Sequence, residues 1–213
     1  MDKKIIINIG RQFGGGGLGV AHELGRKLGI PVYDKELIQK AAQDSGFSKE
    51  LFEERDEKKR FFSLSSIFAN RYSDTENYMS DSGLFKIQSD TIRKIAEQGS
   101  AIIVGRCADY ALREYDNVIN VFLHGDVEKR VQRAVDAYGI DYAKAAEEVI
   151  KTDKQRASYY NFYTGRKWGD IQNYDLTIDS TLIGIDNTVK IIKEFVSNFM
   201  CYIFPSIEIF YKF

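Results

Sequence analysis

A strand, a glycine loop and a helix follow one another directly in residues 4–29. The isoleucines of residues 5–9 form a β-branched run that is typical of a strand buried on both faces. Four consecutive glycines occupy residues 14–17, and apolar residues then recur at helical spacing up to residue 28. Glycine lets the backbone approach an anion closely, and the first N–H groups of a helix attract negative charge. This succession therefore favours a phosphate-binding loop.

The loop departs from the usual phosphate-binding motif, which reads G-x-x-x-x-G-K-[ST]. If Gly14 and Gly16 take the glycine positions of that motif, Gly17 lies where the lysine is expected, and no hydroxyl residue follows it. A flexible glycine turn between a strand and a helix is the alternative that the loop alone leaves open. The predicted phosphate-binding residues are Gly14, Gly15, Gly16, Gly17, Leu18 and Gly19.

Further strands and helices alternate along the rest of the chain. Extended segments are predicted at residues 30–33, 101–104, 117–123 and 174–179. Helices are predicted near residues 34–46, 48–60, 83–98, 108–113, 126–139, 141–163 and 186–199. This alternation predicts an α/β fold with a parallel sheet covered by helices on both faces.

Ligands of such sheets bind beyond the carboxyl ends of the strands. The predicted strands bring several chemically useful segments to that rim, namely the glycine loop, Asp34, Gly105-Arg106, His124 and Asp179. The fold and the glycine loop therefore point to the same edge of the molecule.

Composition excludes some classes of protein. A chain of 213 residues with 44% hydrophobic content is long enough for one substantial core. A formal net charge of −1 argues against a general nucleic-acid binder, which usually has a basic excess. Cys107 and Cys201 have no metal-type spacing and are expected to be free thiols in a reducing cytoplasm. No signal peptide and no apolar run long enough to cross a bilayer is recognised, so no membrane partner is expected.

Basic residues gather between the third and last predicted strands. Arg130 and Arg133 lie three residues apart and share one helix face. Lys154 with Arg156, and then Arg166 with Lys167, follow along the chain. Because arginine binds phosphate oxygens in pairs and stays charged, this grouping indicates an anionic ligand. A solvated helix face paired with glutamates is the alternative for any single arginine.

Several separate blocks, in order, resemble the cytidylate kinase-like branch of the nucleoside monophosphate kinases. The resemblance covers the chain from Ile5 to about Phe195. The blocks are residues 11–14 (RQFG), 32–38 (VYDKELI), 103–110 (IVGRCADY), 153–156 (DKQR), 159–160 (YY), 163–165 (YTG) and 174–180 (YDLTIDS).

The resemblance implies a three-layer α/β/α P-loop kinase fold with a helical lid. It also implies phosphoryl transfer from ATP, with Mg²⁺, to a nucleoside monophosphate, of which CMP is the expected one. The acceptor-binding residues that it implies are Asp34, Lys40, Arg106, Asp153 and Arg156. Arg130 and Arg133 match the helix leading to the lid, so the residues expected to act in catalysis are Arg11, Arg130, Arg133 and Arg156.

Arg11 enters that set because the loop lysine is absent. Arg11 is the nearest cation in sequence, and the hypothesis is that its side chain folds back over the loop. Asp109 is a candidate magnesium ligand in place of the missing hydroxyl, and a plain surface carboxylate is the alternative. The missing lysine also leaves open a nucleotide-binding sensor without activity, or a kinase for another small phosphorylated acceptor.

A single kinase-like domain is expected over residues 1–199. Within it, residues 61–82 are predicted to form a mobile flap on the acceptor side, and residues 130–170 the lid region. The apolar tail, residues 200–213, has three roles open to it: packing on the core, forming a homodimer contact, or trailing freely.

Overall fold

The structure of the protein is a computed structural model, and it describes residues 4–38 and 82–204. Its centre is a five-stranded sheet with the order β2-β3-β1-β4-β5. Every neighbouring pair of strands is parallel. The strands are β1 (Ile6–Arg11), β2 (Val32–Tyr33), β3 (Ala101–Val104), β4 (Val118–His124) and β5 (Leu176–Asp179).

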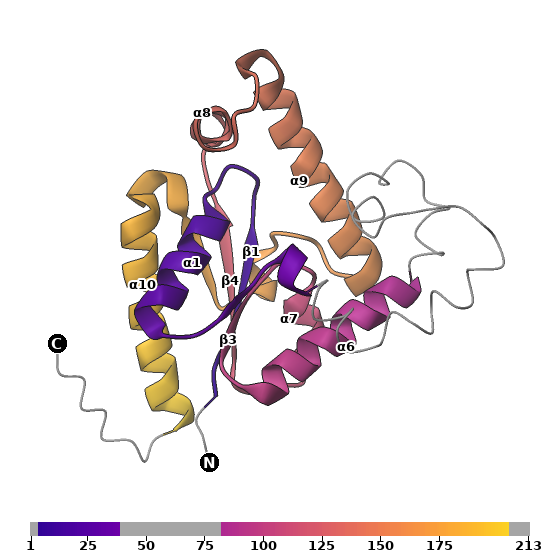
Figure 1. Cartoon of the computed structure of the whole chain (residues 1–213), viewed down its shortest axis with the longest axis vertical. Helices are drawn as coiled ribbons and strands as arrows, with labels where there is room; N and C mark the ends of the chain where they lie inside the picture. Colours follow the sequence, from indigo (N-terminus) through magenta and orange to yellow (C-terminus); the bar gives the residue numbers. More distant parts are fainter. Residues whose placement is uncertain (1–3, 39–81, 205–213) are drawn as a thin grey trace.

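Helices cover both faces of the sheet (Figure 1). Figure 1 shows α1 and α10 side by side on one face, with α6 and α7 on the other. The helices are α1 (Gly17–Leu28), α6 (Ser82–Gln98), α7 (Ala108–Ala111), α8 (Val127–Tyr138), α9 (Tyr142–Thr164) and α10 (Ser180–Ile203), with a short 3₁₀ helix at Ile171–Asn173. The predicted three-layer α/β/α architecture is confirmed.

The central strand β1 separates two hydrophobic clusters. Ile5, Ile7 and Ile9 are buried with apolar residues of α1 and α10. Ile6 is buried on the opposite face, with apolar residues of α6 and α7. Both faces of β1 are therefore covered, which explains why its sequence has apolar residues on both faces, with Asn8 as the exception, rather than an alternating pattern.

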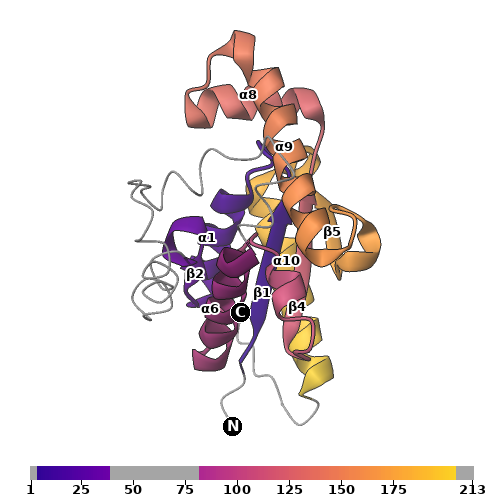
Figure 2. The same ribbon diagram turned by 90° about the vertical axis from the view of Figure 1, so that its right-hand side faces the viewer.

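The carboxyl ends of the parallel strands meet at one edge of the sheet. Beyond that edge lies α8, and α9 leads from it back along the sheet (Figure 2). Asp126 begins α8 by accepting hydrogen bonds from the backbone N–H groups of Glu128 and Lys129. Gly139, with a φ of 64°, ends the helix in the left-handed conformation. The chain predicted as the lid thus includes α8 and α9, and its closure stays a prediction.

The last helix, α10, differs from its prediction in both its start and its end. The last helix begins at Ser180, six residues before the predicted start, and contains a break at Gly184, where φ is 78° and ψ is 168°. That break explains the error, because the helical period of the sequence resumes only after it. The helix also continues to Ile203, so the predicted tail is helical over its first four residues.

The last strand is also shorter than predicted, because β5 begins at Leu176 and Tyr174 still belongs to the turn that follows the 3₁₀ helix. The predicted helix at 48–60, the predicted flap, and the tail after residue 204 lie outside the described residues. Among the helices of the described ranges, none has the length and apolar character needed to cross a membrane.

Candidate functional site

The glycine loop joins the end of β1 to the start of α1. Gly14 and Gly16 have φ values of 74° and 75°, the left-handed region that favours glycine. A β-carbon added at Gly14 would collide with the backbone carbonyl of Arg130, and one at Gly16 would lie 3.0 Å from Nη1 of Arg133. No side chain caps the start of α1, and its first turn has no acidic residue. The positive end of this helix is therefore available to an anion.

Two arginines of α8 hold the loop by its carbonyl oxygens. Nη1 of Arg130 donates to the carbonyl of Phe13 at 3.0 Å, and Nη1 of Arg133 donates to the carbonyl of Gly14 at 3.0 Å. Arg130 also donates from Nε to the carbonyl of Gly125. The structure thus brings Arg130 and Arg133, predicted from their shared helix face and from the family resemblance, against the predicted phosphate-binding loop.

Asp153 of α9 ties the loop to α8. One carboxylate oxygen accepts from the backbone N–H of Phe13 at 2.7 Å, and the other accepts from Nη1 of Arg130 at 2.6 Å. The side chains of this ion pair are only 8% and 15% exposed, for Arg130 and Asp153 respectively. One oxygen thus bonds to the loop and the other to α8, so the structure displays a loop-holding role for Asp153. The contact between Asp153 and an acceptor stays a prediction.

Arg11 lies across the first residue of α1. A β-carbon added at Gly17 would be 2.6 Å from Cγ of Arg11 and 2.8 Å from its Cβ. At the far end of the side chain, a β-carbon added at Gly105 would collide with Nη1 of Arg11. Arg11 is thus held between two glycines, with its aliphatic stem in the space that a side chain at position 17 would need. Its action on donor phosphates stays a prediction.

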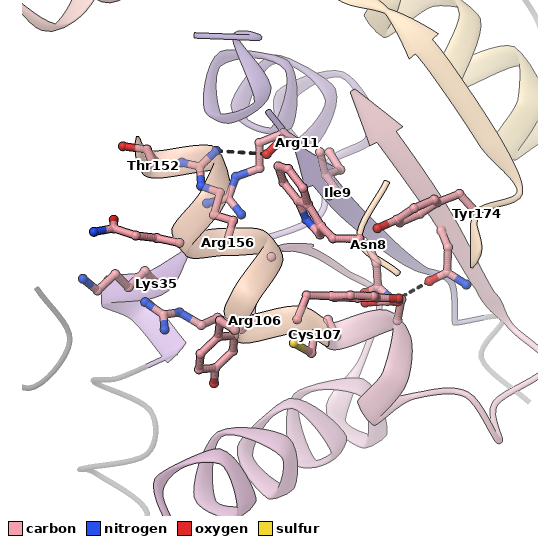
Figure 3. Close-up of a pocket in the computed structure, with 18 residues that line it drawn as sticks. Asn8, Ile9, Arg11, Lys35, Arg106, Cys107, Thr152, Arg156 and Tyr174 are labelled. Atoms are coloured by element: carbon pink, nitrogen blue, oxygen red, sulfur yellow. Dashed lines mark hydrogen bonds between the residues drawn. The ribbon is translucent and has the colours of Figure 1, made fainter. Parts of the chain in front are cut away.

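A cavity of about 370 Å³ opens beside the loop and the end of β1 (Figure 3). Four cationic side chains line it: Arg11, Lys35, Arg106 and Arg156. Burial, followed by the charges of Arg156 and Arg106, lowers the pKa of Arg11 to about 9. Burial and the charge of Arg106 also lower the pKa of Lys35. This concentration of positive charge makes the cavity suitable for an anion.

An unusual turn after β3 places Arg106 in the cavity. Gly105, Arg106 and Cys107 follow one another with φ values of 77°, 58° and 52°. Left-handed backbone at residues other than glycine is strained and persists where the surroundings hold it, often at functional sites. Nη1 of Arg156, from α9, donates to the main-chain carbonyl of Arg11 at 2.9 Å. The structure therefore brings together Arg11, Arg106 and Arg156 from three distant segments.

The far part of the cavity is polar without being cationic. Asp109 accepts a hydrogen bond from the hydroxyl of Tyr160 at 2.6 Å, and burial raises the pKa of Asp109. Burial likewise raises the pKa of Tyr160 and of Tyr174, which also line the cavity. Asp109 as a magnesium ligand stays a prediction, and this environment does not favour it, since burial there disfavours the ionised carboxylate that a hard cation needs.

Asp34 follows β2 and caps a helix that begins at Lys35. Its carboxylate accepts from the backbone N–H groups of Glu36 and Leu37, each at 3.0 Å. The negative charge of Asp34 also acts on Arg11, whose pKa it raises in part against the effect of burial. Contact of Asp34 with an acceptor stays a prediction. Lys40 lies outside the described residues.

Sequence reasoning missed several polar residues that support the site. Ser180 is buried and donates to the carbonyl of Gly15 at 2.7 Å, and the side-chain oxygen of Gln12 accepts from the backbone N–H of Gly125 at 3.1 Å. Asn8 and Asn120 are partners in the register of β1 and β4, and both line the cavity. The sequence did contain a sign of this pair, because Asn8 and Asn120 are polar residues within segments that are otherwise mostly apolar.

Comparison with known proteins agrees with this geometry. The sequence model of the cytidylate kinase-like family matches residues 6–182. A cytidylate kinase of Methanopyrus kandleri is 25% identical over 198 residues, which cover 89% of this chain and 91% of that protein. A cytidylate kinase of Sulfurisphaera tokodaii is 27% identical over 137 residues, or 64% of this chain and 73% of that protein.

Solved structures agree on the fold. An uncharacterized protein from Eubacterium ventriosum matches with a TM-score of 0.68 and 31% identity, over 91% of this chain and 99% of that chain. The shikimate kinase of Bacteroides thetaiotaomicron matches with a TM-score of 0.52 and 17% identity, over 91% and 98% of the two chains, and this likeness concerns the fold alone. The family match extends over most of the chain, including the glycine loop, α8 and α9, so this protein belongs to the cytidylate kinase-like family.

Proposed function

We propose that this protein transfers a phosphoryl group from ATP to a nucleoside monophosphate, with CMP as the acceptor. The observation that carries the proposal is the cavity beside the glycine loop, lined by Arg11, Lys35, Arg106 and Arg156. A donor phosphate chain on the loop and an acceptor phosphate among these cations would meet at the end of β1. The family and its cytidylate kinase relatives supply the reaction class and the nucleotide.

The donor site is the loop and the start of α1. Its left-handed glycines and uncapped helix start suit a polyphosphate held by main-chain N–H groups. Arg133 lies directly beside Gly16, where it would meet the same phosphates. In this proposal the loop needs no lysine, because Arg11 and Arg133 bring positive charge to it from outside.

The chemistry needs no nucleophilic side chain. A phosphate monoester is already a nucleophile at neutral pH, so the chain must position two phosphates in line and neutralise the charge between them. Arg11 and Arg156 perform the second task in this proposal, since they lie together where the loop and the cavity adjoin. Exclusion of water by the lid would prevent hydrolysis of ATP.

Magnesium would arrive with ATP rather than occupy a site made by the protein. Among residues 4–38 and 82–204, no group of three or more His, Cys, Asp or Glu side chains is arranged to hold a metal ion. Mg²⁺ commonly keeps its waters and binds through substrate phosphates, which this site would permit. When bound, the ion would supply neutralising charge between the donor phosphates.

The test is to incubate the purified protein with ATP, Mg²⁺ and each of CMP, UMP, AMP and GMP, and to separate the products by chromatography. The expected result is ADP with CDP, formed faster than any other diphosphate. Arg156→Ala is the test variant, and it should lower the rate of CDP formation without abolishing ATP binding. ATP binding without a diphosphate product would instead support the sensor, and ADP formed only with another small phosphate ester would support a different acceptor.

A further inference from the structure

Two asparagines that line the cavity form an amide pair, of which Asn8 is buried and Asn120 half-buried. Asn8 of β1 and Asn120 of β4 lie side by side in the sheet, and Nδ2 of Asn8 donates to Oδ1 of Asn120 at 2.9 Å. Asn8 is only 3% exposed, and its own Oδ1 has no hydrogen-bond partner among the described residues. A buried polar atom without a partner is destabilising, so it needs an explanation.

The pair has a defined hydrogen-bonding capacity. The bond between the two amides uses one polar atom of each side chain. The other polar atom of each can bond to a ligand, and these are the acceptor Oδ1 of Asn8 and the donor Nδ2 of Asn120. Turning both amides over would exchange the two roles and still leave one donor and one acceptor. A ligand edge with a hydrogen-bond donor next to an acceptor, as on the amide or amidine edge of a heterocyclic ring, would complement the pair.

The cavity also has walls that suit a flat ring. Four aromatic side chains line it, namely Tyr159, Tyr160, Trp168 and Tyr174. Phe122 packs nearly perpendicular to Trp168, with 5.3 Å between ring centroids, and also contacts Tyr174, with 4.8 Å between ring centroids. Aromatic side chains are large, rigid surfaces on which a planar ring packs well.

The cations lie at the opposite end of the cavity. Figure 3 shows the charged ends of Arg106, Lys35 and Arg156 gathered away from Asn8 and Tyr174. Arg11 and Asn8 are three residues apart in β1, and three residues of strand span about 10 Å. This separation leaves room for a sugar between a phosphate at the cations and a ring at the amide pair.

We propose that the Asn8–Asn120 pair is the subsite that recognises the heterocyclic ring of the acceptor, and that it determines the preference for a nucleotide over a simpler phosphate ester. The inference rests on the proposed function for the identity of the acceptor. It adds two binding residues from the middle of strands β1 and β4, away from the glycine loop and from the residue blocks that carry the family resemblance.

The test compares the binding of CMP with that of ribose 5-phosphate, which has the phosphate and sugar but no ring. Trp168 is the only tryptophan of the chain and lines the cavity, so its fluorescence reports binding directly, with calorimetry as a second measurement. Asn8→Ala and Asn120→Ala should each weaken CMP binding about tenfold, as expected for one lost buried hydrogen bond, and leave ribose 5-phosphate binding unchanged.

Asn117→Ala is the matched control, because Asn117 also makes one side-chain hydrogen bond, to the carbonyl of Lys4, and it lies directly before the start of β4. It should change neither affinity. Thermal unfolding and ATP binding of each variant would show that the fold and the donor site persist. If Asn8→Ala fails this check, Asn120→Ala, at a less buried position, carries the test.

The outcomes separate this inference from the proposed function. Wild-type affinity for CMP in both variants, or equal weakening of CMP and ribose 5-phosphate, would overturn the ring subsite even if CDP is formed. A wild-type protein that binds CMP no better than ribose 5-phosphate would overturn it too. Ring-dependent binding through Asn8, without any diphosphate product, would uphold the subsite and reject the proposed reaction.

Discussion

At the scale of single residues, Arg11 leaves no space for a side chain at position 17. The stem of Arg11 occupies the space where a side chain of residue 17 would begin, at 2.6 Å from its β-carbon position. A lysine in the usual place and an arginine at position 11 are therefore alternatives that cannot coexist without rearrangement. The glycine at position 17, where the usual motif has lysine, is thus explained by the side chain of Arg11, which occupies that space.

A double-mutant cycle on Arg11 and Gly17 tests this relation. Arg11→Gly should lower kcat about 10²–10³-fold, or about 2.7–4 kcal/mol, by analogy with loss of one transition-state hydrogen-bond donor. Gly17→Lys alone should also lower kcat, because its side chain collides with Arg11. The double variant should be more active than either single variant, since the new lysine enters the vacated space.

The measurement is the rate of CDP formation at saturating ATP and CMP. Arg26→Ala is the control, because Arg26 is an exposed arginine of α1 paired with Glu23, and it should leave the rate unchanged. Additive losses in the double variant would show that Arg11 does not stand in for the missing lysine.

The raised pKa of Asp109 predicts that the stability of the protein depends on pH. Burial raises the pKa of Asp109 in the folded state, so the unfolded chain loses this proton first as the pH rises above about 4, the ordinary range of an Asp carboxyl. The folded state is then penalised at higher pH and carries no penalty below that range. Asp109→Asn keeps an acceptor for Tyr160 and should raise Tm at pH 7.5, with the gain vanishing near pH 4.

Thermal unfolding at several pH values checks this prediction. Asp116→Asn, a change at an exposed carboxylate on the following turn, is the control and should leave Tm nearly constant. A stabilisation by Asp109→Asn that is equally large at pH 4 would contradict burial as its cause.

At the scale of elements, α8, α9 and the glycine loop form one connected unit. Asp153 of α9 bonds both to the N–H of Phe13 in the loop and to Arg130 of α8. Arg130 bonds in turn to the carbonyl of Phe13. Movement of α8 would therefore be transmitted to the loop that is proposed to hold the donor phosphates.

Asp153→Ala should destabilise the protein by about 3–5 kcal/mol, because it leaves the charge of Arg130 buried without its partner. The measurement is the midpoint of urea unfolding. Asp90→Ala removes the partner of Arg93 in a pair whose side chains are 38% and 32% exposed, for Arg93 and Asp90, and it should cost at most about 1 kcal/mol. Similar effects of the two variants would refute a special role for the buried pair.

At the scale of the whole molecule, the site is made by segments from most of the described chain. The loop follows β1, Arg106 follows β3, Arg133 lies on α8 and Arg156 on α9. None of these segments forms the site alone, so a bound nucleotide would join them and stabilise the molecule as a whole.

ATP with Mg²⁺ should therefore raise Tm. At about 100 times its Kd, a ligand of the folded state adds about 2.7 kcal/mol, which corresponds to an increase of about 5–10 °C for a chain of this length. Differential scanning fluorimetry measures the shift, with sodium chloride at matched ionic strength as the control. An equal shift with salt alone, or none with ATP, would contradict a nucleotide site in this protein.

Much of the fold was already determined by local patterns in the sequence. The apolar run before the glycines, the alternation of strands with helices, and the helix ends at Gly29, Gly139 and Gly165 each depend on residues near one another. The alternation of these elements predicts a parallel sheet, and a parallel sheet in turn predicts the edge at which a ligand would bind. The start of α10 escaped prediction because Gly184 interrupts the helical period there.

Only the tertiary structure decided which of these residues meet. The sequence presented Arg11, Asp153 and Asn8 as a candidate cation, a candidate acceptor ligand and an unremarked strand residue. Packing placed the first across Gly17, the second against the loop and Arg130, and the third opposite Asn120. Sequence periodicity determines the face on which a side chain lies, whereas strand register and helix packing, which depend on distant segments, determine its partner.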